Sequence, residues 1–113
     1  MTGMALADYE KLPARRWLAV QTTSVGMYPH GDEAPVEDRA FYRTIDIGVD
    51  VIYTPARTRF MALVEEAGGR AVGGLDMLLY QGIQAFELWN PEGKVPPEIV
   101  DKARVMMRRE LER

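Results

Sequence analysis

One glutamine lies on the apolar side of a predicted helix. Residues 74–89 (GLDMLLYQGIQAFELW) repeat apolar side chains with helical spacing. The polar side of this helix carries Asp76, Tyr80, Gln84 and Glu87. The apolar side carries Met77, Leu78, Ala85 and Leu88 around Gln81. A buried amide without partners costs about 1–3 kcal/mol, so Gln81 is expected to meet a backbone group, a water molecule or a ligand.

The sequence has few residues of the kinds that bind metal ions or act as nucleophiles. The only histidine, His30, lies in a Pro- and Gly-rich loop near Asp32 and Glu33. One imidazole and two loop carboxylates would hold a divalent ion weakly, and an exposed loop histidine is much commoner, so we assign no metal site. The chain has no cysteine, which excludes disulfides, thiolate nucleophiles and cysteine-ligated metals.

The length and net charge of the chain limit the classes of protein to which it can belong. The 113 residues, 47% of them hydrophobic, predict one small domain over 1–113, which is short for an enzyme that must build its own cleft. The net charge of −3 gives no basic patch for nucleic acid, and the apolar runs are too short to cross a bilayer. With no signal-peptide pattern at the N-terminus, we expect a cytoplasmic protein without nucleic-acid or membrane partners.

The elements that would position such residues alternate between strand and helix. Near-continuous apolar runs predict strands over 17–22 and 47–53, buried on both faces as in a parallel sheet. Thr58 can cap a helix that ends at Gly68-Gly69, and residues 70–72 form a short third strand.

Two further helices follow the last strand. After the helix over 74–89, a C-terminal helix over 96–113 begins at a Pro-Pro pair, and residues 1–16 form a weakly patterned lead-in segment. This order predicts an α/β fold with right-handed crossovers and helices packed on a parallel sheet.

Three motifs follow one another in a fixed order: residues 20–29 (VQTTSVGMYP), residues 50–55 (DVIYTP), and residues 74–81 (GLDMLLYQ) followed by 85–89 (AFELW). Together they resemble the C-terminal part of shikimate dehydrogenase. The resemblance covers about residues 9–89. It implies a partial Rossmann-like parallel sheet with flanking helices and C-terminal helices, equivalent to the second half of an NADP-binding domain.

The resemblance also implies site residues. It places four of them beside the nicotinamide of NADP: Thr23, Ser24, Val51 and Gly74. Tyr53 and Gln81 fall where the family holds its hydroxy acid substrate, shikimate or 3-dehydroshikimate. Ligands of open parallel sheets bind beyond the carboxyl ends of strands, which agrees with these places. The structural alternatives remain open: Thr23 and Ser24 as turn residues, Tyr53 as a strand aromatic, and Gly74 as a helix entry.

Several parts of the family's machinery have no counterpart in this sequence. No Gly-x-Gly-x-x-Gly or Gly-x-Gly-x-x-Ala motif is present, and none of Lys11, Lys94 and Lys102 matches the context of the family's proton-transferring lysine. Loss of an oriented general acid alone typically costs about 100- to 10,000-fold in rate. We therefore predict no catalytic residues in this chain, very weak or absent NADP binding by the chain alone, and no turnover.

The missing half has a structural consequence and leaves other functions open. Exposed apolar edges favour self-association, so we expect a homo-oligomer or a partner that carries the missing N-terminal half. The chain would then be a truncated or split part of an NADP-dependent enzyme that reduces 3-dehydroshikimate to shikimate. A non-catalytic binding or oligomerisation module derived from the same fold is the alternative, as is a segment of a quinate/shikimate dehydrogenase.

Overall fold

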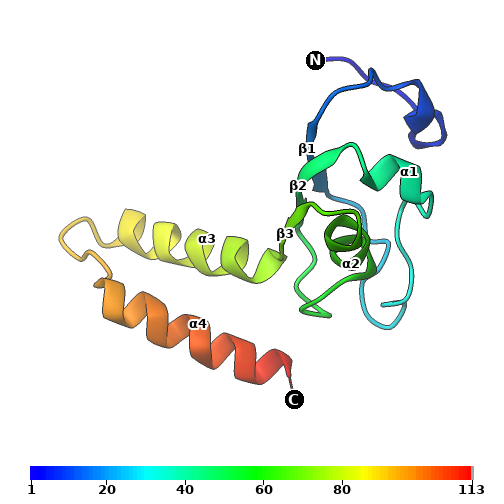
Figure 1. Cartoon of the computed structure of the whole chain (residues 1–113). Helices are drawn as coiled ribbons and strands as arrows, with labels where there is room; N and C mark the ends of the chain where they lie inside the picture. Colours follow the sequence, from blue (N-terminus) through cyan, green and yellow to red (C-terminus); the bar gives the residue numbers. More distant parts are fainter. Residues whose placement is uncertain (113) are drawn as a thin grey trace.

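The structure is a computed structural model that describes residues 1–112. The last residue of the predicted C-terminal helix, Arg113, lies outside the described residues. The elements follow one another as a short 3-10 helix η1 (Leu6–Lys11), β1 (Trp17–Gln21), α1 (Arg39–Tyr42), β2 (Ile45–Asp50), α2 (Arg59–Glu66), β3 (Arg70–Val72), α3 (Gly74–Trp89) and α4 (Pro97–Leu111). Figure 1 shows two parts, a small sheet with α1 and α2, and an arm made of α3 and α4.

The predicted parallel sheet is confirmed. Its strand order is β1-β2-β3, and β2 pairs in parallel with both neighbours. Helix α2 covers one face of the sheet, where Gly48 lets it come close: a Cβ on Gly48 would lie 2.6 Å from Val64 and 3.1 Å from Phe60. These two side chains, together with Tyr42 and Ile45, form the centre of the core.

The opposite face of the sheet is exposed, which corrects the prediction of strands buried on both faces. Leu18 pairs with Ile47, so both side chains point to the same side, and they are 65% and 39% exposed. Val20 on the same face is 52% exposed. Within residues 1–112 the helices that pack on the sheet lie on its other face, so these apolar side chains have no covering layer.

The second strand ends three residues earlier than predicted. β2 runs from Ile45 to Asp50, and residues 51–53 belong to the turn that follows it. The reason is the side chain of Asp50, whose Oδ1 accepts a hydrogen bond from the backbone N–H of Ile52 at 2.9 Å. A side chain that binds the backbone two residues ahead replaces the next pair of strand hydrogen bonds and turns the chain out of the sheet.

The helix boundaries of α2 are as predicted. Thr58 caps α2, since its side chain accepts a hydrogen bond from the N–H of Met61 at 3.2 Å. Gly68 ends the helix with a φ of +93°, a conformation that other residues rarely adopt. The sequence pattern did not predict η1 or α1, which are short and depend on local contacts such as the capping of α1 by Asp38.

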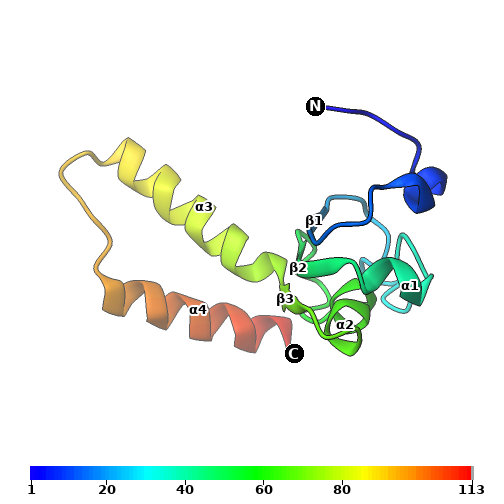
Figure 2. The ribbon, with the colours of Figure 1, turned by 45° about the horizontal axis from the view of Figure 1, so that its top comes forward.

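Helices α3 and α4 run side by side as an antiparallel arm that points away from the sheet (Figures 1 and 2). Arg104 on α4 donates hydrogen bonds to Asp76 at 2.8 Å and to the Tyr80 hydroxyl at 2.7 Å, both on α3. Near the far end, Glu87 accepts a hydrogen bond from the N–H of Val95 at 3.1 Å. The side of α3 with the polar residues therefore faces α4.

The burial expected for Gln81 is consequently wrong for this chain. Gln81 is exposed, and Met77 and Leu88 on the same side of α3 are 48% and 79% exposed. The periodicity correctly located an apolar side, but the ion pairs and hydrogen bonds with α4 lie on the other side, and α4 reaches the apolar side only near Leu78. Leu78 on the apolar side is half-buried, whereas Met77, Gln81 and Leu88 stay exposed.

Candidate functional site

A pocket at the carboxyl ends of β1 and β2 brings together four of the six predicted site residues. Its volume is about 310 Å³. The residues that line it are Thr22, Thr23, Ser24, Met27, Val51, Ile52, Tyr53 and Thr54. The loop after β1 and the segment after β2 are joined by a hydrogen bond from the N–H of Tyr28 to the carbonyl oxygen of Thr54 at 2.9 Å. The pocket thus lies at the edge where ligands bind to open parallel sheets.

Gly74, the fifth predicted residue, lies directly against this turn. A Cβ at position 74 would lie 2.2 Å from the carbonyl oxygen of Val51 and 2.8 Å from that of Ile52. The N–H of Gly74 donates to the Ile52 oxygen at 3.1 Å. Only glycine fits this approach, so the first turn of α3 is fixed against the backbone that carries Val51 and Tyr53. The structure thus brings Gly74 and Val51, two of the predicted site residues, into direct contact.

A buried hydrogen-bond network supports the loop that carries Thr23. The Thr23 hydroxyl donates to Oε1 of Gln21 at 2.6 Å and accepts from the N–H of Val25 at 3.2 Å. The amide nitrogen of Gln21 donates to the carbonyl oxygen of Val25 at 3.1 Å and to Asp50 Oδ1 at 3.4 Å. Thr23 therefore serves as a turn residue, as the structural alternative stated, and the turn sets the position of its backbone at the pocket.

The centre of this network is Asp50, which is fully buried at 0% exposure. Its Oδ1 accepts from the N–H of Ile52 and its Oδ2 accepts from the Thr58 hydroxyl at 2.7 Å. Burial of a carboxylate is costly unless it is hydrogen-bonded, and here three donors meet that requirement. One side chain thus connects the loop after β1, the turn after β2 and the start of α2.

Sequence reasoning missed Gln21 and Asp50. A signal for both was present: each is a polar residue at the end of an apolar run, and the two are partners in the β1–β2 register. Polar residues that end adjacent parallel strands at the same register position lie side by side, which predicts a shared hydrogen-bond network below the pocket.

Gln81, the sixth predicted residue, is separated from the pocket along α3. Gln81 follows Gly74 by seven positions, which corresponds to about 10 Å along the helix axis. Tyr53 reaches toward the arm and lines a second, apolar pocket of about 310 Å³. The other residues of that second pocket are Leu75, Leu78, Met106, Met107, Glu110 and Leu111. The structure therefore places Tyr53 at the junction of sheet and arm, with Gln81 farther out.

The chemistry available in the first pocket is that of hydroxyl and backbone groups. The residues that line it carry no charged side chain. Such groups suit the carboxamide of a nicotinamide ring, but they do not suit a pyrophosphate, which is bound by cationic side chains or by a glycine-rich loop at a helix N-terminus. His30 is exposed, and no group of three metal-binding side chains occurs within residues 1–112.

Comparisons with known proteins agree with the motifs. Residues 74–106 match the family described as Shikimate 5'-dehydrogenase C-terminal domain. The shikimate dehydrogenase (NADP(+)) of Trichormus variabilis is 37% identical over 99 residues, which make up 85% of this chain and 34% of that protein. The chain matches the C-terminal part of shikimate dehydrogenases.

Solved structures extend the match to the fold. A chorismate mutase/shikimate 5-dehydrogenase fusion protein from Clostridium acetobutylicum has a TM-score of 0.82 at 30% identity, over 94% of this chain and 38% of that one. Shikimate 5-dehydrogenase from Listeria monocytogenes, solved with shikimate and NAD, has a TM-score of 0.71 at 28% identity, over 87% and 35% of the two chains. The predicted Rossmann-like α/β class is therefore confirmed.

The match to shikimate dehydrogenase is partial in length. The chain spans about a third of the curated relatives it matches, 34% of the Trichormus variabilis protein and 29% of a relative from Methanopyrus kandleri.

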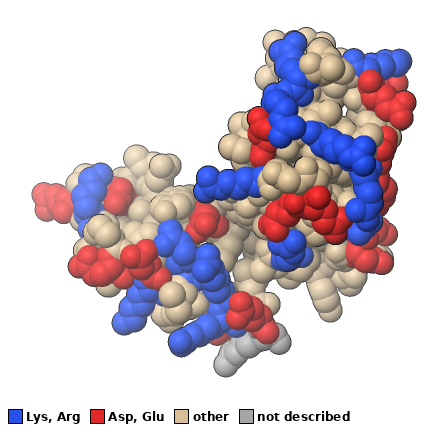
Figure 3. All heavy atoms as spheres, in the orientation of Figure 1, with Lys and Arg blue, Asp and Glu red and all other residues tan. Residues whose placement is uncertain are grey.

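On the surface, acidic and basic side chains are interleaved on the face shown in Figure 3. Within residues 1–112, no helix has the length and apolar character needed to cross a bilayer.

Proposed function

We propose that this chain forms the nicotinamide side and part of the substrate side of an NADP-dependent shikimate dehydrogenase, which reduces 3-dehydroshikimate to shikimate. The observation that carries the proposal is the meeting of Thr23, Val51 and Tyr53 in one pocket at the carboxyl edge of the sheet. Gly74 supports it, since its close contact with Val51 brings the start of α3 to the same place.

The proposed roles divide between cofactor and substrate. Thr23, Ser24, Val51 and Gly74 would border the nicotinamide, which supplies hydride transfer when NADP is bound. Tyr53 would place its hydroxyl against the substrate, since its side chain is 42% exposed beside the pocket. Gln81 would donate its amide hydrogens to a substrate hydroxyl, because its exposed amide on an apolar helix side remains available to a partner.

The chain is proposed to work with an N-terminal half of the enzyme. Residues that bind the pyrophosphate and transfer the proton would come from that half, so the chain alone would bind NADP very weakly and show no turnover. The exposed apolar faces of the sheet and of α3 support a packing partner, because such surfaces are costly to leave in water. Self-association through these faces is the expected behaviour when that half is absent.

The deciding experiment measures shikimate-dependent reduction of NADP⁺ by the purified chain, with and without an added N-terminal half from a complete shikimate dehydrogenase. Activity in the mixture only is the expected result. In that mixture, Gln81→Ala should raise KM for shikimate about tenfold or more, the typical effect of a lost substrate hydrogen bond. Gln84→Ala, an exposed site on the other side of α3, is the matched control and should leave KM unchanged.

Two other outcomes would change the proposal. Turnover by the chain alone would refute the inference that proton transfer and phosphate binding need another half. If the chain is folded and the mixture still shows no reduction of NADP⁺, a non-catalytic binding or oligomerisation module would be favoured. The exposed apolar faces of the sheet and α3 also suit such a module. Comparison of quinate with shikimate in the active mixture tests the quinate/shikimate alternative.

A further inference from the structure

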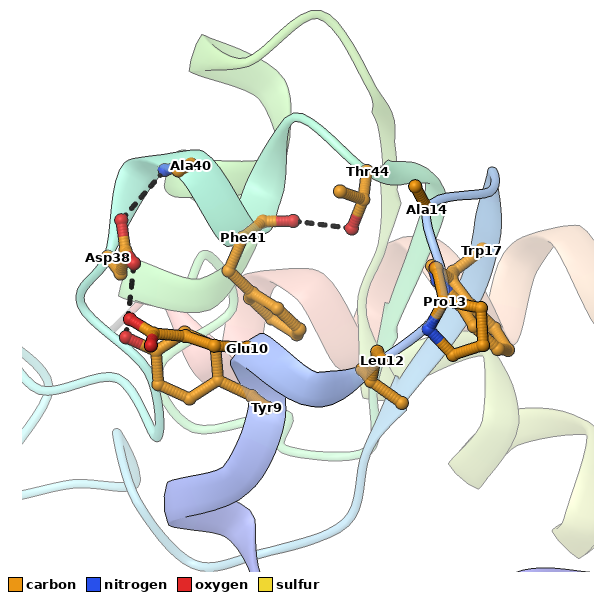
Figure 4. Close-up of a pocket in the computed structure, with 10 residues that line it drawn as sticks. All are labelled: Tyr9, Glu10, Leu12, Pro13, Ala14, Trp17, Asp38, Ala40, Phe41 and Thr44. Carbon is orange, nitrogen blue, oxygen red and sulfur yellow. Dashed lines mark hydrogen bonds between the residues drawn. The ribbon is translucent and has the colours of Figure 1, made fainter.

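A third pocket, lined by aromatic and apolar side chains with two carboxylates, opens at the opposite edge of the sheet. It has a volume of about 310 Å³ and lies between η1, the start of β1 and α1 (Figure 4). Its walls include Tyr9, Glu10, Leu12, Trp17, Asp38 and Phe41. β1 begins at this pocket and ends at the pocket lined by Thr23, Val51 and Tyr53, here called the nicotinamide-side pocket. At about 3.3 Å per residue the two pockets are therefore about 15 Å apart.

Aromatic rings form much of the wall of this pocket. Tyr9 and Phe41 meet edge to face, with ring centroids 5.5 Å apart. The Trp17 ring is held by a hydrogen bond from its Nε1 to the carbonyl oxygen of Pro13 at 3.3 Å. The guanidinium of Arg15 lies 5.0 Å from the Trp17 ring centroid, so this indole already attracts one cation from within the chain.

Negative charge gathers at the other end of the pocket. Asp38 accepts hydrogen bonds from the N–H of Ala40 at 2.9 Å and from the Tyr9 hydroxyl at 3.1 Å. Desolvation, together with the hydrogen bond to Asp38 and the nearby charges of Asp38 and Glu10, raises the pKa of Tyr9. The Tyr9 hydroxyl therefore stays a neutral donor between two carboxylates. Figure 4 shows this end well separated from Trp17 and Pro13.

These carboxylates lack a positive partner in the part of the chain that the structure describes. Among the ion pairs of residues 1–112, none includes Asp38 or Glu10. Two arginines from neighbouring segments are already engaged elsewhere: Arg39 pairs with Glu66 and Arg16 with Asp46. The pocket thus combines aromatic walls with unneutralised negative charge.

We propose that this pocket binds a small organic cation, an ammonium or amidinium group joined to an aromatic body. The cationic group would lie against Asp38 and Glu10, and the aromatic body would pack on Phe41 and Leu12 toward Trp17. Charge-assisted hydrogen bonds to the carboxylates and ring packing against Phe41 would both contribute. The site lies on the far edge of the sheet from the nicotinamide-side pocket and does not depend on the proposed dehydrogenase role.

The test is a titration of the full chain with benzamidinium, followed by ¹H–¹⁵N NMR. The expected result is saturable shifts of the Trp17 indole N–H and of the backbone N–H groups of α1. Benzamide, which has the same shape without the charge, should bind at least about tenfold more weakly. Equal binding of benzamide, or shifts confined to the Thr23 and Tyr53 region, would overturn the proposal.

Variants separate charge recognition from simple packing. Asp38→Asn keeps one oxygen that can cap α1 and replaces the oxygen that accepts from Tyr9 with an NH2 group, which can donate to the Tyr9 hydroxyl instead. It removes the charge and should weaken benzamidinium binding about tenfold. Glu10→Gln, at an exposed position with no capping role, provides an independent second variant and should weaken binding two- to threefold, a rough figure for an exposed charge. Asp32→Asn, an exposed loop carboxylate outside the pocket, should leave it unchanged. Unchanged affinity in both Asp38→Asn and Glu10→Gln would refute the proposal.

Discussion

Replacement of Gly74 by alanine should destabilise the chain and disturb the candidate site together. The added Cβ would lie 2.2 Å from the carbonyl oxygen of Val51, whereas ordinary van der Waals contacts are 3.4–4 Å. The first turn of α3 or the turn over 51–53 must therefore move by more than 1 Å, a displacement estimated from overlap of packed atoms. Such overpacking lowers the free energy of unfolding by about 1–3 kcal/mol. The added Cβ clashes with backbone atoms here, and these cannot rotate away as a side chain could.

The matched control is another glycine of the same helix. Gly82 is exposed, and a Cβ there would have no heavy atom within 4 Å. Gly82→Ala should therefore stabilise the chain by up to about 1 kcal/mol through helix propensity alone. Urea unfolding followed by circular dichroism measures both variants, and NMR shifts of Val51 and Tyr53 report on the pocket. If Gly74→Ala proved as stable as Gly82→Ala, the argument from close backbone approach would be wrong.

Three further results are expected from the same unfolding assay. Asp50→Ala leaves three buried donors without an acceptor and should cost about 3 kcal/mol, whereas exposed Asp46→Ala should cost less than about 0.5 kcal/mol. Thr58→Ala removes the cap of α2 and should cost about 1–2 kcal/mol, and Thr58→Ser should restore most of it. The hydrogen bond from Arg59 lowers the pKa of Glu37 below its ordinary value of 4.5. The small contribution of this pair to the free energy of unfolding is therefore present above that pH and is lost as pH falls through the folded pKa. In Glu37→Gln, the free energy of unfolding should fall less steeply with pH in this acidic range.

The sequence was sufficient to predict those features that depend on local residue preferences, such as helix caps and helix ends. Thr58 followed by an apolar periodic segment and Gly68 predicted both ends of α2, because caps and left-handed stops depend on the residues themselves. The parallel sheet followed from the alternation of strands and helices. The carboxyl-edge location of Thr23 and Tyr53 then followed from the sheet.

Where the outcome depends on a partner or on side-chain bonding, sequence periodicity misled. The apolar side of α3 around Gln81 predicted burial, yet α4 binds the opposite side through Arg104, and periodicity cannot say which side a neighbour will choose. The end of β2 was misplaced because Asp50 looked like a strand residue, whereas its carboxylate turns the chain. Burial and hydrogen bonding of a single side chain thus decided what propensity could not.

The junction between sheet and arm has a thermodynamic consequence. One residue, Gly74, follows β3 closely, begins α3 and contacts the turn that carries Val51 and Tyr53, so the tilt of the arm and the shape of the pocket cannot vary independently. A molecule that holds the α3–α4 arm in one tilt must then change the affinity of the pocket for its ligand. By linkage, occupancy of the pocket changes the affinity of the arm for that molecule by the same factor.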